Sequence, residues 1–203
     1  MPGAPSGFSG FCGFVGLFGF CGTMAGMTEA VLDRLAALLG EPDRQAPQGN
    51  WDAAEEFLGV RLPSGYKTFV DRWGPGTLDG FLTVLGPVDG TADEARELWG
   101  LWYGWKPGRQ RNHDFDPFPY HPEPGGLIGW GADHYGGAWF FLAQGPDPDR
   151  WPIVVVSDTG QWYATRGTFP AFLLRCLERE DYPLFLDLTW PRPQPHYLPY
   201  RAG

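Results

Sequence analysis

The sequence predicts an α+β fold, in which a twisted, mainly antiparallel sheet of about five to six strands is flanked by helices. Two observations predict this class. Residues 28–73 and 169–177 carry apolar side chains at helical spacing, whereas residues 77–85 and 127–165 carry short apolar runs separated by turns rich in Gly, Pro and Asp. Consecutive strands joined by short turns pair antiparallel. The length of 203 residues suits one domain with a sizeable core and is too short for two full domains.

Residues 1–26 form a Gly/Phe-rich leader that we leave outside the expected domain. They carry no charged side chain, whereas a secretory signal needs a basic segment ahead of its apolar core. Their apolar run is broken by glycines and is shorter than the roughly 20 residues of a membrane span. Three interpretations remain: a disordered leader, a weak membrane or partner anchor, or an upstream extension that is not translated, with Met24 or Met27 as the true start. We favour the third.

The expected domain, residues 27–183, opens with three helices over residues 28–40, 50–59 and 64–74. Asn50 is a suitable N-cap for the second helix, and Gly59 is placed to end it. Each helix has one apolar stripe and one polar face. The stripes comprise Leu32, Leu35, Ala36 and Leu39 in the first helix, Trp51, Ala54 and Leu58 in the second, and Tyr66, Phe69, Val70 and Trp73 in the third.

Strands and two further helices follow. Asp79-Gly80 indicates a hairpin turn within residues 77–85. The capping box that begins at Thr91 predicts a helix, and five prolines make residues 106–126 a loop. Thr168 is expected to cap the last helix. The later strands are expected at residues 127–130, 138–143, 152–157 and 161–165. Residues 184–203 form an aromatic and Pro-rich tail, which is expected to lie extended over the surface without forming an element.

Several of these motifs together resemble one family. The pattern consists of an acidic helix ending in Leu58-Gly59, then Leu62-Pro63, Tyr66, Phe69 and a helix-ending Gly74. It resembles the opening signature of the SMI1/KNR4 family, within the SUKH superfamily, and the resemblance continues to about Asp181. The resemblance implies a non-enzymatic, protein-binding domain, in bacteria often an immunity protein that neutralises a toxin.

Composition narrows the choice of partner. The net charge of −9 and the pI near 4.8 argue against a nucleic-acid partner, because binding to phosphates depends largely on Lys and Arg. A basic protein partner fits this balance better, although acidity also serves solubility alone. Cys12, Cys21 and Cys176 have no metal-like spacing and support neither a disulfide framework nor a zinc site. A reducing, cytoplasmic location is the simplest inference.

No catalytic motif is recognisable, so we expect no enzyme and no cofactor. The sequence contains no G-x-S-x-G elbow and no phosphate-binding loop. His113, Asp114, Asp116 and His121 lie in a proline-broken loop, which favours a solvated loop over a metal site. Asp133 and His134 adjoin Gly136-Gly137, where an aspartate serves turn geometry.

The expected binding surface is an anionic patch. Exposed carboxylates would complement a basic partner, and aromatic side chains would supply most of the affinity. The alternative is that these carboxylates only solvate helix faces. The candidate residues are Glu55, Glu56, Asp71, Asp79, Asp133 and Asp158 for the charge, with Trp130 and Trp139 as the aromatic anchors.

The resulting hypothesis is a cytoplasmic, non-enzymatic immunity protein that binds a cognate toxin, with no nucleic-acid or membrane partner. An alternative from another class is a carbohydrate or cell-wall associated regulatory module, because Trp and Tyr faces stack on sugars and the fungal members of the resembled family are tied to wall synthesis. An enzyme is the third interpretation. The sequence does not identify the partner or the oligomeric state.

Overall fold

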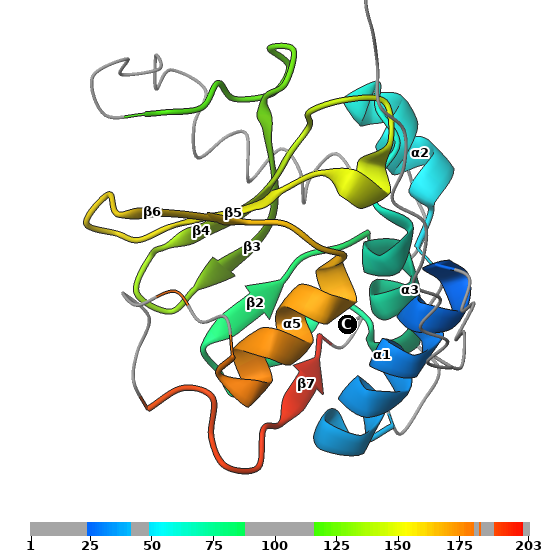
Figure 1. The fold of residues 1–203 in the computed structure, drawn as a ribbon, viewed down its shortest axis with the longest axis vertical. Coiled ribbons are helices and arrows are strands. Elements are labelled where there is room, and N and C mark those ends of the chain that lie inside the picture. Colours follow the sequence, from blue (N-terminus) through cyan, green and yellow to red (C-terminus); the bar gives the residue numbers. More distant parts are fainter. Residues whose placement is uncertain (1–23, 42–48, 88–115, 181–182, 184–188, 201–203) are drawn as a thin grey trace, which may run out of the picture.

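The computed structural model describes residues 24–41, 49–87, 116–180, 183 and 189–200, and within them it confirms the α+β class (Figure 1). The helices are α1 (Met24–Leu39), α2 (Trp51–Leu58), α3 (Ser64–Trp73), the short 3-10 helix η1 (Pro148–Arg150) and α5 (Phe169–Glu178). The strands are β1 (Gly76–Leu78), β2 (Leu82–Val84), β3 (Leu127–Asp133), β4 (Ala138–Leu142), β5 (Ile153–Val156), β6 (Trp162–Thr165) and β7 (Tyr197–Pro199).

All seven strands form one antiparallel sheet in the order β6-β5-β4-β3-β2-β1-β7. Strands β1 to β6 are neighbours in the order of the sequence, as expected where short turns join them, and β2 pairs with β3 although residues 85–126 lie between them. One irregularity interrupts β3, where the register shifts between Gly129 and Gly131. A β-bulge of this kind bends the strand and increases its twist.

The seventh strand corrects two expectations. The tail forms an element, β7, and the sheet has more strands than the five or six expected. Tyr197 anchors β7 because its buried hydroxyl donates a 2.7 Å hydrogen bond to the Gly74 carbonyl. The backbone of Tyr200 donates to the Pro75 carbonyl, so the nitrogen of Pro199 faces away from β1. A proline at such an edge position removes no hydrogen bond from the ladder.

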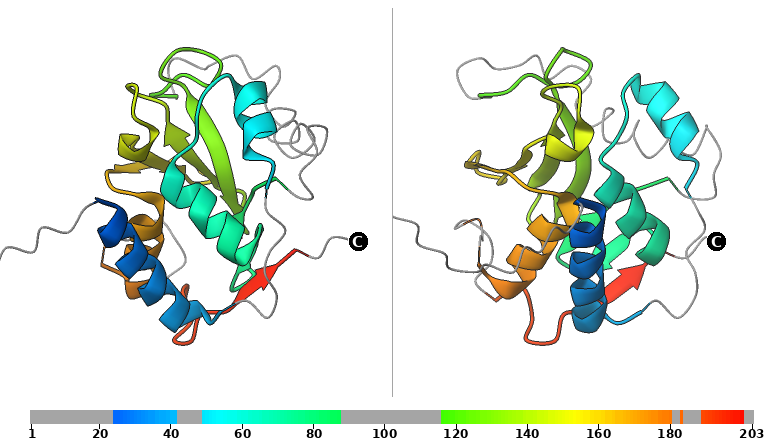
Figure 2. Two further views of the ribbon diagram at one scale, coloured as in Figure 1. Left: turned by 90° about the vertical axis from the view of Figure 1, so that its right-hand side faces the viewer. Right: turned by 45° about the vertical axis from the view of Figure 1, so that its right-hand side comes forward.

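The main core lies between one face of the sheet and helices α1, α3 and α5, which Figure 2 shows packed on that side. Tyr66 and Phe69 of α3 meet Phe169 of α5 edge to face, with ring centroids 5.2 and 5.4 Å apart. Trp130 of β3 also meets Phe169, at 4.9 Å. Aromatic pairs in this geometry add to the stability gained from burial. Most of the described aromatic residues thus lie in or against the core.

The opposite face of the sheet is also covered. Phe118 and Tyr120 pack against a second cluster there, formed by Leu127, Ala138, Phe140, Leu142, Val154 and Val156. β4 and β5 therefore bury side chains on both faces, as a continuous apolar run predicts.

The predicted helix ends are confirmed at α2, at both ends of α3 and at the C-terminus of α1, whereas two predicted N-caps differ. The Asn50 side chain accepts a hydrogen bond from the Ala53 amide, and Gly59 ends the helix with a positive φ of 68°. α1 begins at Met24, before the predicted cap at Thr28 and inside the range assigned to the leader. Thr168 precedes α5, but its side chain makes no capping hydrogen bond.

Two predictions concern residues that the structure does not describe: the helix that begins at Thr91, and the part of the proline-rich loop before residue 116. Among the described helices, none is both long enough and apolar enough to cross a membrane.

Candidate functional site

The acidic residues of the predicted patch do not gather on one surface. Asp133 ends β3 and lies opposite Leu82. α2 lies near the other end of β3, because His121 links the two elements. His121 makes a hydrogen bond to the backbone of Leu58, the last residue of α2, and the backbone amide of His121 donates to the carbonyl of Leu127, the first residue of β3. At about 3.3 Å per residue, the two ends of β3 are separated by roughly 20 Å. Glu55 and Glu56 of α2 therefore lie far from Asp133, and the patch as predicted is wrong.

Two of these carboxylates hold the helices together. Glu55 pairs with the Lys67 ammonium at 2.6 Å and accepts the Leu62 amide at 2.9 Å. Asp71 accepts the Trp51 indole N–H at 2.8 Å. These side chains fix α2 against α3.

Two others organise turns. Asp79 accepts the amides of Arg192 and His196 at 3.1 and 2.7 Å. Asp133 accepts the Gly137 amide at 2.9 Å and the Trp139 indole N–H at 3.1 Å. Both positions thus have structural roles. Glu56 and Asp158 are the predicted carboxylates that remain exposed.

The two aromatic anchors are also corrected. Trp130 and Trp139 are both 0% exposed and lie in the main core, so neither side chain reaches a partner in this conformation. The carbohydrate alternative needs exposed tryptophan faces, and every tryptophan in the described ranges is buried or half-buried. Exposed large apolar side chains are instead Phe57, Tyr135, Leu198 and Tyr200.

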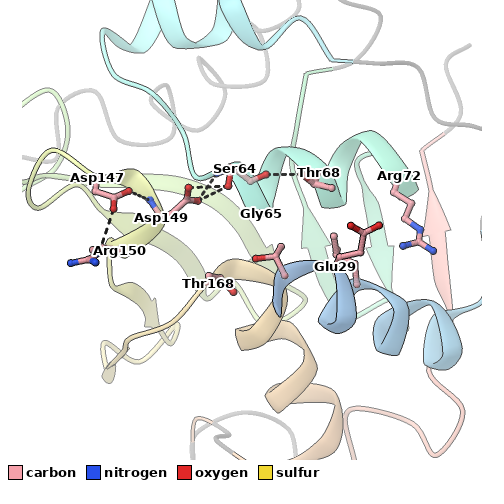
Figure 3. Close-up of a pocket in the computed structure, with 11 residues that line it drawn as sticks. Glu29, Ser64, Gly65, Thr68, Arg72, Asp147, Asp149, Arg150 and Thr168 are labelled. Carbon is pink, nitrogen blue, oxygen red and sulfur yellow. Dashed lines mark hydrogen bonds and ion pairs between the residues drawn. The ribbon is translucent and has the colours of Figure 1, made fainter. Parts of the chain in front are cut away.

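A groove that the sequence did not predict lies between α1, α3, η1 and the start of α5 (Figure 3). Its volume is about 570 Å³. Glu29 lines it from α1, Asp149 from η1 and Asp147 from the position before η1, while Ser64 and Thr68 line it from α3. We refer to this site, defined by these five residues, as the acidic groove.

One wall of the acidic groove is built by a cap supplied from elsewhere in the chain. Pro63 precedes α3 and offers no capping side chain. Asp149 replaces it, accepting the Ser64 amide at 2.6 Å and the Ser64 hydroxyl at 2.9 Å. A carboxylate at a helix N-terminus is stabilised by the free amides and by the helix dipole. Asp147 in turn accepts the Asp149 amide at 3.2 Å, which fixes η1.

The charge of the acidic groove is negative. Arg72 lines it but is paired with Glu41 and Asp33 and lies over the Trp73 ring. The hydrogen bond from Arg72 lowers the pKa of Glu41 and keeps this partner ionised. Arg150 is 81% exposed and lies 3.4 Å from Asp147. Three carboxylates and the two guanidinium groups of Arg72 and Arg150 line the groove, and two further carboxylates outside the lining, Asp33 and Glu41, pair with Arg72. The lining carboxylates are Glu29, Asp147 and Asp149.

Sequence reasoning missed this site because it depends on contacts between distant segments. By their residue types alone, Asp147 to Arg150 indicate a turn and Glu29 indicates only a helical position. One local signal existed: Asp147-Pro148-Asp149 is a good start for a short helix. Nothing local places that helix against Ser64.

In the described part of the chain, no group of three or more His, Cys, Asp or Glu side chains is arranged to hold a metal ion. Asp116 and His121 are the described members of the cluster noted in the sequence. No model of a known protein family matches the chain, and no curated protein matches it.

Proposed function

We propose that this protein is a non-enzymatic binding domain of the SMI1/KNR4 kind, an immunity protein that neutralises a cognate toxin. Its acidic groove would receive basic side chains of the toxin. The observation that carries the proposal is the groove itself, where fixed carboxylates line a concave surface of about 570 Å³. Complementary charge speeds encounter and selects between partners.

The groove is suited to recognition because its carboxylates are held in place before a partner arrives. Asp149 is fixed by Ser64, and Asp147 by the Asp149 amide. A preorganised site loses less entropy on binding than a flexible one. The exposed Glu29 side chain and the net charge of −9 would add attraction at longer range.

The α+β fold agrees with the fold that the resemblance implies, which supports the proposal at that level alone. Many folds host unrelated functions, so the functional argument depends on the site.

The biological test is co-expression with each toxin candidate encoded beside this protein. Rescue of growth and co-purification of the pair are expected for the cognate toxin. Failure of both with every neighbouring candidate would remove the immunity assignment.

The site is tested by charge reversal in that complex. Glu29→Lys in the groove should slow association about three- to tenfold at low salt and weaken its salt dependence. Glu56→Lys is the matched control, because it changes the same charge at an exposed helical position outside the groove. Equal effects of the two variants would assign the attraction to net charge and contradict a role for the groove.

A further inference from the structure

The outer edge of β6 presents unused backbone hydrogen-bonding groups. The Ser157 amide donates to the Gln161 carbonyl, so these two residues form a hydrogen-bonded pair at the β5–β6 turn. From this pair the two strands run without a register shift to the last pair, Ile153 opposite Thr165. Paired groups alternate along an antiparallel ladder, so Tyr163 and Thr165 bond to β5 while Trp162 and Ala164 face outward. In the described structure neither of these two outward residues has a backbone partner on that side, and Ala164 is exposed.

The edge of β6 is short but lacks three other features that usually prevent strand pairing. Edge strands are commonly protected by proline, by charged side chains or by a bulge. The opposite edge of the sheet has such protection, because Pro199 removes an outward donor from β7. By contrast, β6 reads Trp-Tyr-Ala-Thr, with no proline, no charge and regular pairing to β5.

The edge is complementary to itself. We propose that two copies of this chain associate by antiparallel pairing of their β6 strands, around a two-fold axis at Tyr163, to form one continuous sheet. Trp162 of each copy then lies opposite Ala164 of the other, and their outward groups form four backbone hydrogen bonds. This pairing places a large ring beside a small side chain at both symmetric positions.

The flanking charges favour this direction of pairing. Asp158 precedes β6 in the β5–β6 turn and Arg166 follows the strand; both are exposed, and in the described structure neither has an ion-pair partner. In the antiparallel pair, Arg166 of one copy lies opposite Gly160 of the other copy and within reach of that copy's Asp158. The two-fold axis repeats this Arg166–Asp158 contact, so it occurs twice. A parallel pair would place like charges together. Two strands of this length form a small interface, so we expect a weak dimer with a Kd of about 100 µM.

Sedimentation equilibrium of the full chain tests the proposal up to about 500 µM. Asp158→Arg or Arg166→Asp alone should raise the dimer Kd about tenfold, because each reversal acts at two contacts. The double variant restores the opposite charges across the axis and should return to within about threefold of wild type. Ala164→Pro should abolish the dimer, whereas Ala164→Ser retains the amide and should leave it unchanged.

Hydrogen exchange locates the interface. The amides of Trp162 and Ala164 should exchange more slowly as the protein concentration rises, whereas the amide of Tyr163 is already protected by β5. A chain that stays monomeric throughout the concentration range would overturn the proposal. A dimer whose association is not restored in the Asp158→Arg/Arg166→Asp double variant would also overturn it. The same holds for a dimer in which the exchange of the Ala164 amide does not slow as the protein concentration rises. None of these results bears on the acidic groove, so the two proposals fail independently.

Discussion

Two neighbouring tryptophans in the core differ in how their indole nitrogens are satisfied. The rings of Trp130 and Trp139 meet edge to face, with centroids 5.5 Å apart, and both side chains are 0% exposed. Trp139 donates its N–H to Asp133, whereas the N–H of Trp130 has no hydrogen-bond partner in the described structure. An unpaired buried donor carries the cost of desolvation without a compensating bond.

This difference predicts unequal costs for the same substitution. Trp139→Phe should lower the free energy of unfolding by about 1.5–3 kcal/mol more than Trp130→Phe, because only the first removes a hydrogen bond to a charged group. Both variants lose the same atoms from the core, so each controls for the cavity left in the other. Chemical denaturation measures the two values. Equal losses would contradict the assigned role of the indole N–H.

At the scale of single residues, the sequence identified caps better than it identified a surface. Asn50 and Gly59 were predicted correctly because capping depends on neighbouring backbone groups. Glu55 and Asp71 were mistaken for free surface charges because their partners, Lys67 and Trp51, lie on a different helix from each carboxylate. Helical spacing indicates which face of a helix is polar, but it does not show what packs beside that face.

Among the elements, β7 depends on a carboxylate from a distant part of the sequence. Asp79 lies in the β1–β2 turn with φ 54° and accepts the amides of Arg192 and His196, which hold the segment that leads into β7. Asp79→Asn keeps the shape and the tolerance for positive φ but loses the charge and one acceptor. We expect it to lower the free energy of unfolding by about 1–2 kcal/mol.

The matched control for this prediction is Asp158→Asn, the same change at an exposed turn, with an expected effect within about 0.5 kcal/mol. Hydrogen exchange at the Leu198 amide should accelerate in the Asp79 variant more than exchange within β4, since the loss acts on one edge of the sheet. A uniform change across the sheet would show that Asp79 supports the fold generally and does not specifically anchor β7.

The elements that were predicted correctly have strong local signals. α2 and α3 have clear periodicity, and short turns join β1 to β2, β3 to β4 and β5 to β6. β7 was missed because the proline content of the tail argues against a regular strand, and edge pairing tolerates a proline whose nitrogen faces outward. That tolerance depends on the register with β1, which the sequence of the tail alone does not contain.

At the scale of the whole molecule, the class of fold was predictable and the acidic groove was not. Alternating elements define the layers, and the apolar stripes define which faces meet. The groove requires η1 to lie against the start of α3, a contact made through Asp149 and Ser64 across a long stretch of sequence. Such a juxtaposition follows from the packing of complete layers and has no periodic signature.

Two buried tyrosines join the helical layer to the sheet and should control how the whole fold responds to alkaline pH. The Tyr66 hydroxyl of α3 donates to the Leu85 carbonyl, and the Tyr197 hydroxyl of β7 donates to the Gly74 carbonyl. Burial raises the pKa of both hydroxyl groups above the ordinary value of 10.0. The unfolded chain therefore releases two protons near pH 10 that the folded chain retains.

The sign of the effect follows directly. The stability associated with these groups is fully present below pH 10 and is lost as the pH rises further, at about 1.4 kcal/mol per pH unit for each tyrosine. Tyr66→Phe should therefore reduce the slope of the unfolding free energy against pH by about 1.4 kcal/mol per unit between roughly pH 10 and 11.5. Urea denaturation across this range measures it, with Tyr135→Phe as the control because Tyr135 is 56% exposed. If the Tyr66 variant keeps the wild-type slope, the buried hydroxyl does not couple proton release to unfolding.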